Sequence, residues 1–340
     1  MKKPTVVMFG VGAMGSIIAR MLLERDAEIV GAVARSTVGK TLGEVSSLEG
    51  DAARVVVEAD AAEVLARTKP DLVVMTIASY MEDVKEPVLT CLRHGANVIS
   101  LAEENLYSWH TSPEDTAEID RVARENGVTY TCSGHQDGYW VQLVATLMGT
   151  AHRIDEVRGK ASWNVDDFGP ELARDQQVGD TAEEFAAWLG TAERPPTFGR
   201  NSLHAVAAAS GLTVEHSTTE TEPVFATEDM RCAALDTTVP AGRVIGFTDI
   251  DVVTTKEGPR LVLEMTGKVY SPGEADSNAW VLKGEPDLDL ENQVLPTHLT
   301  TCATLVNRVP QVLNAEPGYV TVAGLPRLQY MGGPISSHLA

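Results

Sequence analysis

The first 36 residues constrain the fold of this chain more than any other segment. Residues 5–9 (Thr-Val-Val-Met-Phe) form a continuous apolar run rich in β-branched side chains, which is typical of a buried strand. A G-x-G-x-x-G motif follows, residues 16–25 have helical periodicity, and residues 28–33 form a second apolar run. A glycine motif between a strand and a helix, with a second strand at this distance, predicts a dinucleotide-binding βαβ unit.

Each glycine of the motif has a separate task in such a unit. Gly10 permits a tight turn, Gly12 lets the main chain approach a pyrophosphate, and Gly15 allows close packing of helix on strand. The N–H groups at the helix N-terminus, including those of Ala13 and Met14, are available to phosphate oxygens. The alternative is a purely structural glycine turn in an α/β protein. The motif reads Gly10-Val11-Gly12-Ala13-Met14-Gly15.

The end of the second predicted strand distinguishes between the two nicotinamide cofactors. An NAD site usually has Asp or Glu there, which binds the 2′-hydroxyl of the ribose. This chain has Arg35, Ser36 and Thr37 instead. A guanidinium pairs well with a 2′-phosphate and the two hydroxyls donate hydrogen bonds, so NADPH is favoured over NADH. If Arg35 instead stacks on the adenine, both cofactors are accepted.

Composition limits the classes of partner. A length of 340 residues and a hydrophobic content of 44% suggest two globular domains. The formal net charge of -21 argues against nucleic acids and anionic membranes as partners, because basic patches provide the affinity for both. It suits a neutral or cationic substrate.

The chain also lacks the marks of export, membrane insertion or metal binding. The predicted first strand begins directly after Met1-Lys2-Lys3, without a signal peptide, and no apolar run is long enough to cross a bilayer. The cysteines lie far apart and the histidines lack ligand spacing, which predicts reduced thiols and no metal site. We therefore expect a soluble cytoplasmic protein.

Strand and helix signals alternate over residues 1–150, which predicts a doubly wound parallel sheet of the Rossmann type. Ligands of such sheets bind at the carboxyl ends of the strands, so Thr76, at one such end, is assigned to the cofactor site. Beyond the first two strands, the expected strands are 54–57, 71–76, 97–100 and 128–132, and the expected helices are 61–66, 83–94, 114–126 and 137–149.

The sequence pattern changes after residue 150. Residues 156–163 and 260–266 alternate like strands of an open sheet, and residues 181–189 and 202–211 are helical stretches. We therefore expect an α+β domain over residues 151–290 for substrate binding and dimerisation. Residues 291–340, with a helix at 297–309, are expected to pack back on the first domain.

Two carboxylates follow the predicted strand 97–100, beside the expected position of the nicotinamide. Many dehydrogenases have a lysine here, which polarises a carbonyl oxygen, whereas this chain has Glu103 and Glu104. A carboxylate stabilises an alkoxide poorly, but it can deprotonate an ammonium group and stabilise an iminium ion that accepts hydride. The alternative is an acid pair that stabilises a helix N-terminus.

A second group of candidates follows the strand 128–132. Tyr139, Trp140 and, further along, Trp163 are candidate walls of a substrate pocket. His135 is assigned to the same pocket, either as a base or as a histidine bonded to the main chain, and Asp137 is expected to cap a helix.

Together these motifs resemble the native NAD(P)H-dependent amine dehydrogenases, a family related to 2,4-diaminopentanoate dehydrogenase with an N-terminal domain like that of dihydrodipicolinate reductase. The glycine motif, Ala102-Glu103-Glu104 and residues 134–140 carry the resemblance. It implies reductive amination of a ketone or aldehyde by ammonia, and the reverse deamination of a primary amine. It also implies a catalytic glutamate, Glu103 or Glu104, with Glu103 preferred from its spacing to Trp140, the counterpart of the family's pocket tryptophan. A homodimer formed through the second-domain sheet is a further implication.

Several alternatives remain at this point. Diaminopentanoate dehydrogenases tend to have Asn-Pro-Gly where this chain has residues 135–138, His-Gln-Asp-Gly, which favours a simpler amine as substrate. The His-His and lysine motif of dihydrodipicolinate reductase is absent, and so is the Glu-Lys-Pro of related sugar oxidoreductases. A diaminopentanoate-type enzyme, another imine or carbonyl reductase, and a non-catalytic NADP-binding sensor are kept as alternatives.

Overall fold

The computed structural model describes residues 2–191 and 195–340. The chain forms two compact units, the first of Met1–Gly138 with Leu299–Ala340 and the second of Tyr139–His298. The sequence analysis placed the boundaries at residues 150 and 290 instead. The difference arises because the chain passes between the units inside helical segments, whereas the change in sequence pattern begins only where the strands of the second unit begin.

The first unit contains a seven-stranded sheet in which every pair of neighbouring strands is parallel. The strand order is β15-β6-β5-β4-β1-β2-β3, so the chain adds β2 and β3 on one side of β1 and the later strands on the other side. This order is that of a doubly wound fold and confirms the predicted Rossmann class. The carboxyl ends of β1, β4, β5 and β6 therefore lie side by side. The strands are β1 (Thr5–Phe9), β2 (Glu28–Val33), β3 (Val57–Glu58), β4 (Leu72–Met75), β5 (Asn97–Ser100), β6 (Thr129–Cys132) and β15 (Gly318–Tyr319).

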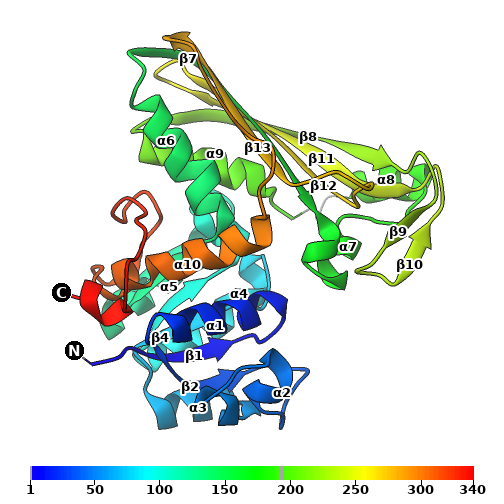
Figure 1. Ribbon diagram of the computed structural model, residues 1–340. Helices are drawn as coiled ribbons and strands as arrows, with labels where there is room; N and C mark the ends of the chain where they lie inside the picture. The colour runs from blue at the N-terminus through cyan, green and yellow to red at the C-terminus, as the bar shows by residue number, and fades with distance from the viewer. Residues whose placement is uncertain (1, 192–194) are drawn as a thin grey trace. The chain divides into compact units, whose positions relative to one another are not determined.

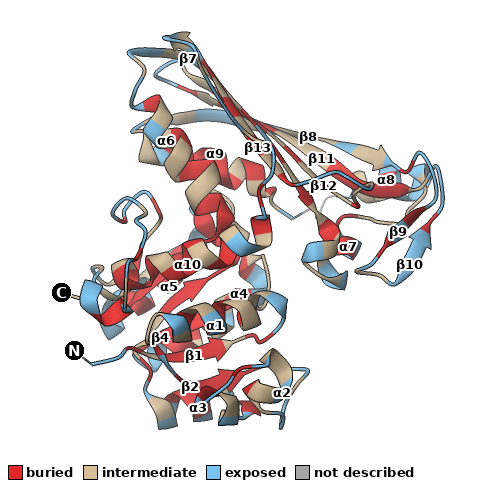
Figure 2. Cartoon of the chain, viewed as in Figure 1, coloured by how far each residue is buried: buried red, intermediate tan, exposed pale blue. Residues whose placement is uncertain are grey.

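Helices cover both faces of this sheet (Figure 1). Successive side chains of a strand point to opposite faces, so Val6 and Met8 pack with α1 and α10, while Val7 packs with α3 and α4. Figure 2 shows the strands between these two layers as largely buried. The helices are α1 (Ala13–Glu24), α2 (Leu42–Ser46), α3 (Ala61–Thr68), α4 (Met81–Arg93), α5 (Pro113–Asn126) and α10 (Thr297–Leu313).

Two predicted elements of the first 150 residues are wrong in detail. The expected strand 54–57 is a 3₁₀ turn at Ala52–Arg54 followed by the two-residue strand β3, because only Val57 and Glu58 pair with β2. The expected helix 137–149 is a π-helix at Gln136–Gln142 that continues as α6 (Leu143–Met148). Periodicity does not separate a π-helix from an α-helix over so few turns.

The second unit is built on a six-stranded mixed sheet of order β14-β13-β7-β12-β11-β8, in which only β7 and β12 are parallel neighbours. Helix α9 (Phe198–Ala209) contacts β8, β11 and β12, and Figure 1 shows it lying along one face. The sequence analysis identified only the segments of β7 and β12. The strands are β7 (Arg153–Asn164), β8 (Val214–Phe225), β11 (Val244–Thr255), β12 (Arg260–Lys268), β13 (Ser277–Glu285) and β14 (Leu288–Asn292).

Smaller elements complete the second unit. A two-stranded ribbon pairs β9 (Met230–Cys232) with β10 (Thr237–Val239), and two short helices, α7 (Pro170–Asp175) and α8 (Ala182–Leu189), precede α9. Among the described residues, no helix combines the length and the apolar character that a membrane crossing requires.

Candidate functional site

The glycine motif forms a tight turn between β1 and α1. Gly10 has a φ of +104°, which side chains rarely allow, and its N–H donates to the carbonyl of Val33 at 2.8 Å. The Thr76 hydroxyl, just beyond β4, donates to the carbonyl oxygen of Gly10 at 3.1 Å. A Cβ at Gly15 would lie 2.3 Å from that same oxygen. The structure thus brings Gly10, Gly15 and Thr76 into one contact.

Gly12 differs from its two neighbours in the motif. A Cβ built at Gly12 meets no described atom within 4 Å, so the surface beside it is open. Gly12 is also the N-cap of α1 and supplies no capping side chain, so it does not cap the N–H groups of the first turn, which includes Ala13 and Met14. An open surface at the positive end of a helix fits a pyrophosphate.

The turn after β2 carries one cationic side chain and two hydroxyl groups. Arg35 and Ser36 are exposed in the turn that follows Val33. The Thr37 hydroxyl oxygen is buried and has no hydrogen-bond partner among the described residues. A guanidinium with neighbouring hydroxyl groups fits a phosphate monoester.

Glu104 has a structural task. Its side chain is only 3% exposed, and its carboxylate accepts hydrogen bonds from the N–H of Met81 at 2.7 Å and from the Ser112 hydroxyl at 2.6 Å. Met81 is the first residue of α4, so this carboxylate caps a helix on a neighbouring segment. The alternative considered in the sequence analysis, an acid that stabilises a helix N-terminus, therefore applies to Glu104. The helix it stabilises is α4, not the 3₁₀ turn that contains Glu104.

Glu103 lies in a different environment. It opens the 3₁₀ turn Glu103–Leu106 directly after β5, and its side chain is half-buried. Burial raises the pKa of Glu103 to about 7, although a hydrogen bond from Ser79 acts in the opposite direction. A carboxyl group that titrates near neutral pH exchanges protons readily in both directions.

Buried hydrogen bonds hold this 3₁₀ turn in place. The Asn105 amide donates to the Tyr130 hydroxyl at 2.6 Å, and the Tyr319 hydroxyl donates to the Asn105 carbonyl at 2.6 Å. Asn105 is completely buried. Tyr130 is on β6 and Tyr319 on β15, so two strands of the sheet fix the segment that carries Glu103. The sequence analysis missed these three residues because their contacts join separate segments, 25 positions apart for Asn105 and Tyr130 and 214 for Asn105 and Tyr319.

The end of β6 lies against the same turn. The Cys132 thiol donates to the carbonyl of Ala102 at 3.0 Å. His135 is buried, its Nδ1 lies 2.8 Å from the Thr300 hydroxyl, and desolvation lowers its pKa to about 3. A neutral imidazole of such low basicity is a poor general base.

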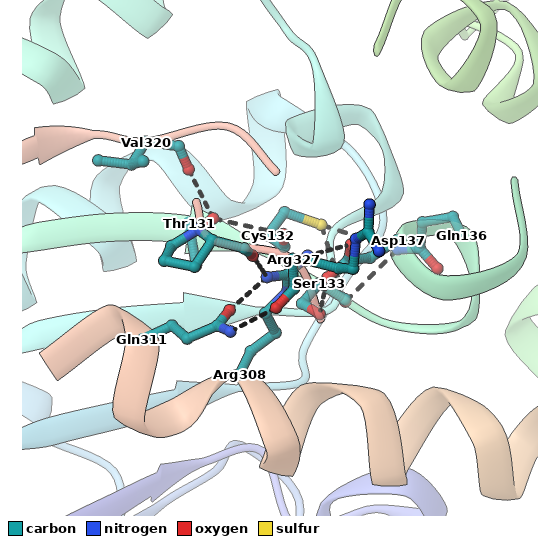
Figure 3. Close-up of polar contacts among 10 residues, drawn as sticks. Thr131, Cys132, Ser133, Gln136, Asp137, Arg308, Gln311, Val320 and Arg327 are labelled. Atoms are coloured by element: carbon teal, nitrogen blue, oxygen red, sulfur yellow. Dashed lines mark hydrogen bonds and ion pairs between the residues drawn. The ribbon is translucent and has the colours of Figure 1, made fainter. Parts of the chain in front are cut away.

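Asp137 does not cap a helix, contrary to expectation. Its carboxylate forms a buried ion pair with Arg308 of α10, with Arg308 Nε 2.5 Å from Asp137 Oδ2 (Figure 3). The sequence analysis missed Arg308. The sequence held one indication of its role, because Arg308 is the only charged residue in the stretch 297–309. A lone charge in a helix that packs on a core requires a buried partner.

The aromatic candidates for pocket walls belong to the second unit. Trp140 is 6% and Trp163 is 9% exposed. The main-chain carbonyl of Tyr139 accepts a hydrogen bond from the indole of Trp280 at 3.0 Å. The strand register puts Trp163 on the same sheet face as Trp280, which lies above Gly159. No cluster of three or more metal-ligating side chains occurs in residues 2–191 and 195–340.

Comparison with known proteins is informative once this geometry is known. The family model of the 2,4-diaminopentanoate dehydrogenase C-terminal domain matches residues 140–339. The 2,4-diaminopentanoate dehydrogenase of Acetoanaerobium sticklandii is 29% identical over 96% of this chain and 94% of its own length. The solved structure of an amine dehydrogenase from Mycobacterium smegmatis is 53% identical, with a TM-score of 0.94 over 97% of this chain and 98% of that one.

More distant structures share the fold alone. The scyllo-inositol dehydrogenase of Lactobacillus casei, solved with bound NAD(H) and scyllo-inositol, has 13% identity and a TM-score of 0.61. The alignment covers 95% of this chain and 93% of that one.

Proposed function

Because the chain belongs to the 2,4-diaminopentanoate dehydrogenase family, we propose that it is an NAD(P)-dependent amine dehydrogenase. It catalyses reductive amination of a ketone or aldehyde with ammonia and, in reverse, oxidative deamination of a primary amine. The likeness to the amine dehydrogenase of Mycobacterium smegmatis supports the reaction class. The observation that carries the proposal is Glu103, a half-buried carboxyl with a pKa of about 7 at the carboxyl end of β5.

Glu103 provides the proton chemistry of this reaction. Its carboxylate accepts a proton from an ammonium ion, which leaves ammonia as the nucleophile. The resulting carboxylic acid gives that proton to the hydroxyl group of the carbinolamine, so that water departs and an iminium ion forms. The carboxylate regenerated in this step stabilises the positive charge of the iminium. A bound nicotinamide cofactor supplies the hydride.

The pH dependence should reveal this group. Because the active base is the carboxylate, we expect the rate at fixed total ammonium to show a break at about pH 7, below which it falls more steeply. Initial rates from pH 5.5 to 9 test this, with the Glu103→Gln variant as the control. The assignment is wrong if both proteins show the same break.

We assign NADPH as the preferred cofactor and NADH as a second, weaker one, bound through Gly10, Gly12, Gly15 and the residues after β2. Replacing Arg35 with alanine is expected to raise the KM for NADPH by about 10–100-fold, the factor that a lost charge-assisted hydrogen bond produces. The KM for NADH should stay nearly unchanged. The exposed Arg54→Ala variant serves as the control, and an equal rise for both cofactors would favour stacking of Arg35 on adenine.

Trp140, Tyr139 and Trp163 are our candidates for the walls of the substrate pocket. Large, mostly buried aromatic side chains favour an apolar substrate over one with further charged groups. We therefore favour a small carbonyl compound or simple primary amine. The alternative is a diamino acid, as the names of the family and of the Acetoanaerobium sticklandii relative suggest.

The assembly we propose is a homodimer formed through the second-domain sheet. On the side opposite α9, cross-strand ion pairs join Arg158 and Lys160 of β7 to Glu264 of β12. Half-buried apolar side chains such as Ile250 and Val252 lie on the neighbouring strand β11. In the proposed dimer, a second copy of the chain would cover these ion pairs and apolar side chains. Sedimentation equilibrium measures the mass of the assembly and so distinguishes a dimer from a monomer.

The four free cysteines suit a reducing compartment, and we propose the cytoplasm.

One experiment tests the activity directly. NADPH oxidation is followed with a panel of small ketones and aldehydes, with and without excess ammonium at mildly alkaline pH, and the product is analysed for amine. Ammonium-dependent oxidation with amine formation supports the proposal. Oxidation that does not require ammonium indicates a carbonyl reductase, and tight NADPH binding without turnover favours a sensor.

A further inference from the structure

A completely buried ion pair joins α10 to the segment that follows β6. Asp137 and Arg308 are both 0% exposed, although they lie 171 positions apart. The contact is bidentate, since Arg308 Nε donates to one carboxylate oxygen at 2.5 Å and Nη2 donates to the other at 2.7 Å. Figure 3 marks these contacts with dashed lines. Such a fork-to-fork contact fixes orientation as well as distance.

The guanidinium is held from its other side as well. Arg308 Nη1 donates to the side chain of Gln311 and to the carbonyl of Pro326, while the Gln311 amide donates to the carbonyl of Arg327 (Figure 3). Helix α10 and the chain that follows it therefore fix the orientation of the guanidinium. Both carboxylate oxygens of Asp137 can accept hydrogen bonds from it in only one orientation of the Asp137 side chain.

Asp137 passes this constraint toward Glu103. Its carboxylate accepts a hydrogen bond from the Ser133 hydroxyl at 2.8 Å, and the N–H of Ser133 donates to the carbonyl of Ser100 at 3.0 Å. The adjacent Cys132 thiol donates to the carbonyl of Ala102. Continuous contacts thus run from α10, through the end of β6, to the residue before Glu103.

Stability alone does not explain an ion pair in this place. Removing two charges from water costs about as much as their attraction returns, and apolar pairs of similar volume are often equally stable. What an apolar pair lacks is direction, because it accepts several orientations of the attached main chain.

We propose that Asp137 and Arg308 are positioning residues that, through Ser133 and Cys132, hold the main chain of Ala102 and thereby set the position of Glu103. Their catalytic effect rests on the proposed function. Their effect on local order does not.

The experiment compares Arg308→Lys with the double variant Asp137→Leu/Arg308→Met. Lysine keeps the charge and loses the fork, and the apolar pair removes both charges together. In both we expect kcat for reductive amination to fall by about 10–100-fold, the cost of misplacing a catalytic group by about 1 Å. The KM for NADPH should change less than twofold. Arg121→Lys, in the exposed ion pair with Glu125, is the matched control and should behave like the wild type.

A second readout is independent of turnover. The alkylation rate of Cys132 is measured by peptide mapping, with the buried Cys232 of the second unit as internal reference. We expect Cys132 to react faster in both variants and Cys232 to react as in the wild type. A double variant with wild-type thermal stability, reduced kcat and reactive Cys132 supports the proposal.

Other results separate the two hypotheses. A double variant that regains both stability and wild-type kcat, with Cys132 still protected, overturns the inference because the pair is then only structural. If the wild type itself shows no ammonium-dependent turnover, the proposed function fails, and the alkylation rates decide on the pair. If Arg308→Lys does not fold, the double variant alone provides both readouts.

Discussion

Replacing Glu103 with glutamine is expected to lower kcat for reductive amination by about 10²–10⁴-fold, the usual contribution of a general acid–base group. Glutamine has nearly the same shape but neither accepts nor releases a proton at neutral pH. Cofactor affinity should be nearly unchanged, because Glu103 lies after β5 and the phosphate-binding turn lies after β1. Steady-state kinetics and NADPH titration by fluorescence measure the two quantities.

The neighbouring residue provides a matched control. In Glu104→Gln the single acceptor oxygen serves the Met81 N–H, so Ser112 Oγ loses its charged acceptor and must turn to face an amide NH2. We expect this variant to be about 1–3 kcal/mol less stable and to keep most of its kcat below its unfolding temperature. If Glu104→Gln is inactive and Glu103→Gln is active, the catalytic assignment is reversed.

Whereas Glu104→Gln should be less stable than the wild type, Glu103→Gln should be more stable. The folded-state pKa of about 7 exceeds the ordinary value of a glutamate, so between these pH values the folded protein binds the proton more tightly than the unfolded chain. The carboxyl group's contribution to stability is therefore lost as pH rises toward 7. The stability of Glu103→Gln relative to the wild type should therefore be greater at pH 8 than at pH 5. Denaturant titrations at these two pH values measure the difference.

The second large effect is expected in the glycine motif, where two equally small changes should give different results. In Gly15→Ala the new methyl group would overlap the Gly10 carbonyl, because the main-chain oxygen lies 2.3 Å from the Cβ position. The strand and helix must separate, and we expect a loss of about 1–3 kcal/mol in the free energy of unfolding. Cofactor binding should weaken as well, since the phosphate-binding turn is distorted.

Gly12→Ala should leave the fold intact. Its φ of -73° suits alanine and no described atom lies within 4 Å of the new methyl group, so stability should change by less than about 1 kcal/mol. The methyl group would occupy the surface that the pyrophosphate approaches, and we expect the Kd for NADPH to rise by about 10–100-fold. Equal loss of stability in both variants, or unchanged cofactor affinity in Gly12→Ala, would contradict the assigned roles.

The Rossmann unit was predictable because its signals are local. Residues 28–33 form β2 and residues 97–100 form β5, as expected, since a short apolar run between turn residues leaves little choice of element. The second sheet was predicted poorly. Thr and Glu alternate along β8, and such a half-buried strand is defined by its neighbours rather than by its own composition.

The candidate site divides along the same line. The sequence by itself determined the dinucleotide turn at residues 10–15, the acid pair after β5 and the resemblance to amine dehydrogenases, because each is a contiguous pattern. Only the tertiary structure revealed the different environments of Glu103 and Glu104 and joined Asp137 to Arg308. These properties depend on burial and on partners from distant segments, since desolvation and hydrogen bonding, rather than residue type, decide how a carboxylate behaves.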